Sequence, residues 1–131
     1  MYIWIEHTAE LELAIAAHSR AAVFEDALSA LAELIAPDGP TGRPVRHTLT
    51  VRASDGEALL ADWLSELVFL ADTEEFVPER VEELALSDRS LRAVVSGRTG
   101  RPSQLVKAVT YHGLELHEEA DGFRARIVLD V

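Results

Sequence analysis

Cysteine is absent from the 131 residues of this sequence. Without it, the protein has no disulfides, thiolate zinc sites, iron–sulfur clusters or cysteine nucleophiles. No apolar run approaches the roughly 20 residues that a membrane-spanning helix needs. The first residues also lack the basic and apolar regions of a signal peptide. These absences predict a soluble, cytoplasmic protein.

Basic residues are scarce as well. The chain has 12 lysines and arginines against 23 acidic residues, which gives a formal net charge of −11. Such a charge repels phosphate backbones and anionic lipid. Arg92, Arg98 and Arg101 form only a weak basic patch, of a kind that is usually a solvated surface. We therefore expect neither nucleic acid nor a membrane as a direct partner.

Motifs of several common enzyme classes are missing. The sequence has no glycine-rich phosphate-binding loop and no Gly-x-Ser-x-Gly nucleophile motif. None of its five histidines belongs to a His-Glu-x-x-His zinc motif. Nucleotide binding by this chain and serine-based hydrolysis thus have no support from the sequence.

The apolar residues, 48% of the chain, follow two periodicities. Spacing of three and four residues predicts helices over residues 21–35 and 59–70. Ser19 is the expected N-cap of the first helix, and Ser54 or Asp55 that of the second. Alternation of apolar and polar residues, or β-rich composition, predicts the strands, at residues 2–7, 11–15, 47–51, 76–86, 91–95, 106–112, 114–116 and 123–131.

Turn residues refine this prediction. Pro78 places the strand over residues 76–86 at a sheet edge or a bulge. Gly97 is expected to end the preceding strand, so that residues 98–103 form an exposed loop. Asp121 and Gly122 predict a hairpin turn. Strands and helices do not alternate one for one, so we predict a single α+β domain over residues 1–131, with mostly antiparallel sheets and two principal helices.

The turn between the first two strands gathers groups that can bind a cation. Glu6, His7 and Glu10 can converge at one end of a sheet, and carboxylates suit Mg²⁺ or Ca²⁺. Alternatively, these are solvent-facing strand residues and a turn histidine. Spacing alone leaves both interpretations open.

The end of the sequence offers further oxygens. Asp130 follows an apolar strand, and Val131 adds an α-carboxylate beside it. Two adjacent negative groups repel each other unless a cation or a basic residue lies between them. If the strand is buried and holds the end in place, Glu10, Asp130 and the terminal carboxylate can form an oxygen-only site; otherwise the end frays.

Lys107 is the only lysine in the chain. A single lysine among arginines suggests that a compact ammonium group is needed at that position. Tyr111 and His112 follow closely, but such residues more often pack and form hydrogen bonds than act as a catalytic pair.

Four segments resemble motifs of the archease family in the same order. Residues 7–10, His-Thr-Ala-Glu, resemble its His-Thr-Ala-Asp motif, and residues 59–67 resemble its Leu-Leu-x-x-Trp-Leu-x-Glu-Leu segment. Residues 107–112, Lys-Ala-Val-Thr-Tyr-His, are similar to its Lys-Ala-Val/Ile-Thr-Tyr-His motif. Residues 129–131 resemble its terminal Asp-Ile. The resemblance covers essentially the whole chain.

This resemblance implies an accessory protein rather than an enzyme. The implied partner is an RtcB-type RNA ligase of tRNA splicing and RNA repair, whose guanylylation and multiple turnover the accessory protein promotes. It also implies a divalent metal, Ca²⁺ or Mg²⁺, held by Glu10, Asp130 and Val131, and a functional role for Lys107. Glu6, His7 and His112 are further candidates.

One position departs from the family pattern. Glu10 replaces the usual aspartate, and Glu6 also stands where the family often has aspartate. The additional methylene in Glu10 moves the carboxylate by about one bond length, which the flexible coordination of Ca²⁺ tolerates better than the strict octahedron of Mg²⁺.

Two other functions are compatible with the same residues. A metal-dependent phosphoesterase or other hydrolase can use Glu10 and Asp130, with His7 or His112 as the base. A chaperone-like α+β protein would need none of these carboxylates. Turnover of phosphoesters by the isolated protein would distinguish the hydrolase from the accessory protein.

Overall fold

The computed structural model describes residues 1–131 and contains seven strands and two helices. In chain order these are β1 (Tyr2–His7), β2 (Glu10–Ala17), α1 (Arg20–Ile35), β3 (Pro44–Arg52), α2 (Gly56–Thr73), β4 (Phe76–Leu86), β5 (Ser90–Thr99), β6 (Ala108–Glu119) and β7 (Gly122–Asp130). All strand pairs are antiparallel. The predicted α+β class is therefore confirmed.

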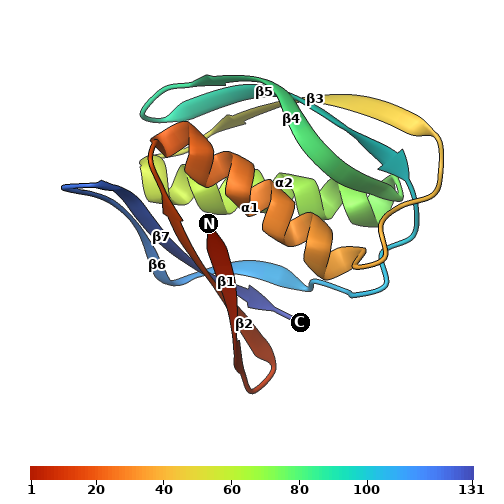
Figure 1. Ribbon diagram of the computed structural model, residues 1–131, viewed down its shortest axis with the longest axis horizontal. Coiled ribbons are helices and arrows are strands. Elements are labelled where there is room, and N and C mark those ends of the chain that lie inside the picture. The colour runs from red at the N-terminus through yellow and green to blue at the C-terminus, as the bar shows by residue number, and fades with distance from the viewer.

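The elements form three layers (Figure 1). A four-stranded sheet has the order β1-β2-β7-β6, and a three-stranded sheet has the order β3-β5-β4. Both helices lie between the two sheets, where α1 contacts β2 and β4 and α2 contacts β4 and β6. One cluster of buried apolar side chains joins all three layers. Each sheet therefore has an inner face on the helices and an outer face on the surface.

The helix ends follow the predicted caps. The Ser19 hydroxyl accepts a hydrogen bond from the Ala22 N–H at 3.1 Å, and a carboxylate oxygen of Asp55 accepts one from the Ala58 N–H at 2.8 Å. Asp55, rather than Ser54, is thus the second N-cap. Neither helix combines the length and apolar character needed to cross a membrane.

Strand β4 confirms the prediction from Pro78, because it is an edge strand with two register shifts, the first between Pro78 and Arg80. The prediction that Gly97 ends a strand is wrong. β5 continues through Gly97 to Thr99, and a Cβ atom on Gly97 would lie 2.1 Å from the Val77 carbonyl oxygen. Glycine at this position permits close approach of the neighbouring strand instead of ending its own.

Candidate functional site

The two ends of the chain meet in the four-stranded sheet. β7, the last strand, lies between β2 and β6, and its register places Asp130 directly opposite Glu10. The Val131 N–H donates to the Ala9 carbonyl oxygen at 3.3 Å, so the end of the sequence lies beside the β1–β2 turn. Lys107 comes to the same place, since its N–H donates to the Asp130 carbonyl oxygen at 2.8 Å.

Glu10 and Asp130 share the outer face of the sheet. Side chains alternate between the faces of a strand, and the neighbouring Leu129 is fully buried on the inner face. Directly opposite residues on adjacent antiparallel strands have Cβ atoms roughly 4.5–5.5 Å apart. His7 pairs with Glu10 from the other side. The outer-face row at this end of the sheet therefore contains His7, Glu10 and Asp130. We call its two acidic members, Glu10 and Asp130, the carboxylate row.

The row does not include two other predicted residues. Glu6 pairs with Leu11 and so points to the opposite face from Glu10. It lines a surface hollow with Glu33 and Leu34 of α1. His112 is exposed and lies in the irregular part of β6 between Thr110 and Glu115.

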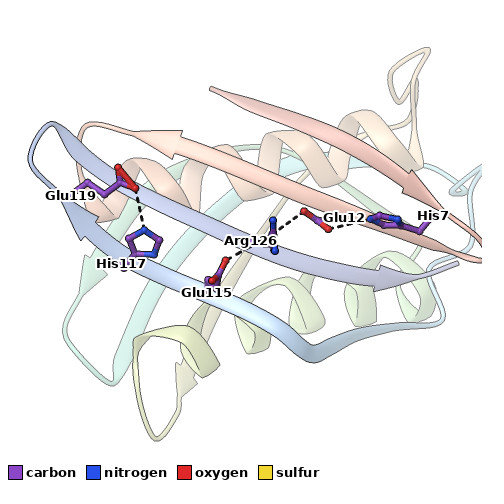
Figure 2. Close-up of polar contacts among 6 residues, drawn as sticks. All are labelled: His7, Glu12, Glu115, His117, Glu119 and Arg126. Atoms are coloured by element: carbon purple, nitrogen blue, oxygen red, sulfur yellow. Dashed lines mark hydrogen bonds and ion pairs between the residues drawn. The ribbon is translucent and has the colours of Figure 1, made fainter.

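A chain of ion pairs adjoins the row (Figure 2). The imidazole Nε2 of His7 lies 3.2 Å from one carboxylate oxygen of Glu12, and the Arg126 guanidinium lies 2.9 Å from the other. Arg126 also approaches Glu115 at 3.8 Å. These contacts direct His7 toward Glu12 and engage Arg126. The alternating charges of β2 and β7 predict such outward-facing pairs, which the sequence analysis did not identify.

Glu10 and Asp130 themselves have no ion pair or side-chain hydrogen bond. Like charges directly opposite each other destabilise a sheet, and a bound cation would remove that repulsion. No group of three or more His, Asp or Glu side chains lies close enough to hold a metal. A cation here would have to be held by the Glu10 and Asp130 side chains together with main-chain oxygens beside them. An all-oxygen set of this kind fits a hard divalent cation.

Tyr111 connects β6 to the helical layer. Its hydroxyl donates to a carboxylate oxygen of Asp62 on α2. This hydrogen bond, together with partial burial, raises the pKa of Tyr111 above its usual value. The residue therefore has a structural contact that holds the Lys107 segment against α2.

The fold and the paired chain ends define a layered α+β domain with two carboxylates at one end of its four-stranded sheet. The model of the Archease protein family (MTH1598/TM1083) matches residues 2–131, and the chain belongs to this family. "Protein archease" of Methanosarcina acetivorans is 35% identical, with 99% of this chain and 95% of that protein covered. The corresponding protein of Methanosarcina mazei is 32% identical over the same shares.

Solved structures share the fold. The solution structure of Methanobacterium thermoautotrophicum protein 1598 superposes with a TM-score of 0.72 at 27% identity, covering 99% of this chain and 98% of that one. The crystal structure of a Thermotoga maritima archease, described as a possible chaperone, has a TM-score of 0.72 at 20% identity, covering 97% and 94%. The latter likeness concerns the fold alone.

Proposed function

We propose that this chain is a non-enzymatic activator of an RtcB-type RNA ligase in tRNA splicing and RNA repair. It promotes guanylylation of the ligase and multiple turnover. Membership of the archease family supports this function. The observation that carries it is the register of β2 and β7, which places the Glu10 and Asp130 carboxylates opposite each other beside the end of the sequence.

In this proposal Glu10, Asp130 and the carboxylate of Val131 hold a divalent cation. When bound, the cation supplies positive charge for a phosphate of the partner's nucleotide. Ca²⁺ is the better match, because its oxygen ligands sit at roughly 2.3–2.6 Å in variable geometry and accommodate the longer Glu10 side chain.

Lys107 completes this arrangement. Its backbone is hydrogen-bonded to Asp130 and its side chain is exposed. From there the ammonium group can pair with the carboxylates or contact a phosphate of the nucleotide. A compact, flexible cation suits a point contact of this kind better than the planar guanidinium of arginine.

The charge of the chain suits a basic partner surface. The net charge of −11 favours encounter with a positively charged ligase and makes the association rate sensitive to salt. The carboxylate row lies at one end of the two central strands, where it can enter a cleft of the partner.

A guanylylation assay with a ligase from the same source tests the function. We expect Glu10→Ala, Asp130→Ala and Lys107→Ala each to reduce stimulation at least about tenfold, the scale of losing a metal-site ligand or its neighbour. Glu118→Ala is the matched control, since Glu118 is an exposed carboxylate on β6 without an ion pair. If all three variants stimulated the ligase like the wild type, the proposal would be wrong.

A further inference from the structure

The basic residues of this acidic chain are concentrated in one part of the fold. Residues 43–52 and 76–101, which contain the three-stranded sheet and its connections, hold eight of the 12 basic residues and four of the 23 acidic ones. The formal charge of these segments is +4, against −15 for the rest of the chain. The net charge of the whole protein therefore does not describe this region.

Five arginines project from the outer face of this sheet or its rim. Arg46 and Arg80 both pair with Ser96 of the central strand, so the three residues form a row across all three strands. Further along the sheet, Arg92 lies opposite Thr50. Arg52 and Arg98 complete the set. We call these five residues the arginine face.

The inner face of the same strands is apolar, which fixes the direction of the arginines. Leu49, Ala93 and Val95 are buried against the helices. Because side chains alternate along a strand, the residues between them point outward. The helical layer covers only the other face of this sheet (Figure 1). At roughly 3.4 Å per residue, the face extends about 20 Å from Arg46 to Arg52.

An open hollow of about 590 Å³ occupies one end of the face, and Arg46, Arg80, Ser96 and Arg98 are among its lining residues. Two carboxylates, those of Glu79 and Glu82, also line it. The Arg80 guanidinium donates to a Glu82 carboxylate oxygen at 3.0 Å. Hydrogen bonds from Ser96 and Arg80 lower the pKa of the Glu82 carboxyl below its usual value. Arg80 is therefore already engaged by a carboxylate of the same strand.

Three of the arginines are available to a partner. Arg46, Arg52 and Arg92 are exposed and have no ion pair or side-chain hydrogen bond. By contrast, Arg98 lies 3.6 Å from Glu79 and donates to the Gly42 carbonyl oxygen. Free guanidinium groups, with the hydroxyls of Thr48 and Thr50 between them, supply the donors that contact phosphate oxygens.

We propose that the arginine face of the three-stranded sheet binds the phosphate backbone of single-stranded RNA. An acidic protein partner fits less well, because stable protein interfaces need apolar or aromatic anchors. None of the exposed large hydrophobic residues of this chain lies on β3, β4 or β5. Because these three strands expose no aromatic ring, base stacking is not a main contact of the arginine face. Binding is therefore independent of sequence and sensitive to salt.

The choice of RNA over other polyanions rests on the proposed function, since the substrate of an RNA ligase is then at hand. The arginine face lies on the far side of the helical layer from the four-stranded sheet that holds the carboxylate row (Figure 1). One chain can therefore contact a ligase through the carboxylate row and a flanking RNA segment through the arginine face.

Fluorescence anisotropy with labelled oligouridylate at low salt tests the inference. Arg46→Ala/Arg92→Ala is expected to weaken binding about tenfold and to lower the log–log salt slope by about 1.4, as two phosphate contacts are lost. The matched control is Arg124→Ala/Arg126→Ala, which changes net charge equally on the other sheet and should leave binding within about twofold. Arg46→Lys/Arg92→Lys should retain the slope, because the charges remain.

Four results would overturn the inference: no binding by the wild type, equal weakening by both alanine pairs, displacement of RNA by polyglutamate at equal charge concentration, or sedimentation showing that the face binds a second copy. A parallel guanylylation assay separates this inference from the proposed function. Ligase stimulation without RNA binding would refute only the arginine face, and RNA binding without stimulation would refute only the activator function.

Discussion

The outer faces of the two sheets have similar architecture and opposite electrostatics. On the four-stranded sheet, Arg126 is engaged by Glu12 and Glu115, and Arg124 lies 3.6 Å from Glu119. The unpaired groups there are carboxylates. On the three-stranded sheet, three of the five outward arginines are unpaired, and Glu83, opposite Val94, is an unpaired carboxylate beside them. Outward positions of a strand contribute little to the core, so their charge is free to select a partner.

The helical layer supports both faces. Trp63 of α2 is fully buried and its indole N–H donates to the Phe24 carbonyl oxygen on α1 at 3.0 Å. The two rings lie 6.4 Å apart in a tilted arrangement. The two faces therefore differ in surface chemistry and share one core.

The largest effect is expected from Trp63→Ala. The lost packing should lower the free energy of unfolding by roughly 3–5 kcal/mol and impair ligase stimulation and RNA binding together. Urea denaturation measures the loss. Trp63→Phe is the control, since it preserves most of the packing and removes only the hydrogen bond to the Phe24 carbonyl oxygen, which keeps its helical partner. The expected cost is roughly 0.5–1.5 kcal/mol. A loss under about 1 kcal/mol for Trp63→Ala would contradict a shared core.

Calcium should affect one face alone. At a Ca²⁺ concentration about 100 times the dissociation constant, binding to the native state stabilises it by roughly 2.7 kcal/mol. Thermal unfolding should show this shift for the wild type and for Glu118→Gln, and not for Asp130→Asn. Without metal, Glu10→Gln should be neutral or stabilising by up to about 1 kcal/mol, because a like-charge pair is removed. A full Ca²⁺ shift in Asp130→Asn would exclude the carboxylate row as the site.

Local signals predicted the elements well. The apolar periods, Ser19 and Pro78 act within a few residues of themselves, so their consequences are visible in the sequence. The end of β5 was predicted wrongly at Gly97, because in sequence a glycine that ends a strand cannot be distinguished from one that lets a neighbouring strand approach closely. Only the Val77 carbonyl oxygen, contributed by a strand separated from Gly97 in sequence, distinguishes them.

The two faces differ in how far the sequence predicts them. Glu10 was predicted from the cation-binding groups of the first turn and Asp130 from the carboxylate next to it. The family resemblance pointed to both. A two-residue turn pairs His7 with Glu10 and so directs Glu6 to the other face, which strand alternation alone would have shown. The arginine face could not be predicted, because α2 separates Arg46 from Arg80 in the chain and only the sheet order joins them.

A smaller effect is expected from releasing the arginines of the four-stranded sheet. Glu115→Gln/Glu119→Gln removes the one partner of Arg124 and one of the two partners of Arg126. Oligouridylate binding should tighten about threefold as these guanidinium groups become available. Stability should change by less than about 1 kcal/mol, since the pairs are exposed.

The matched control for this exchange is Glu25→Gln/Glu66→Gln, which removes two exposed helix carboxylates outside either sheet. If that control tightened RNA binding equally, net charge would explain the gain and the contrast between the faces would lose its meaning.

The smallest effect concerns how the edge strand of the four-stranded sheet is held to α1. The Tyr2 hydroxyl donates to a Glu33 carboxylate oxygen at 2.6 Å. The pKa of Tyr2 is raised to about 12, mainly because the phenol is partly buried and secondly because of this hydrogen bond. Because the pKa is higher in the folded state, the stability that the protonated phenol contributes is fully present below pH 10 and is lost as the pH rises through 12.

Tyr2→Phe should therefore destabilise the protein by at most about 1 kcal/mol at neutral pH, and the difference from the wild type should shrink as the pH approaches 12. Ultraviolet absorbance of tyrosinate follows the ionisation directly. In Glu33→Gln the Tyr2 titration should move toward its usual value, while Tyr111, which pairs with Asp62, should not respond. Ionisation of Tyr2 near pH 10 in the wild type would show that this contact does not fix β1 to α1.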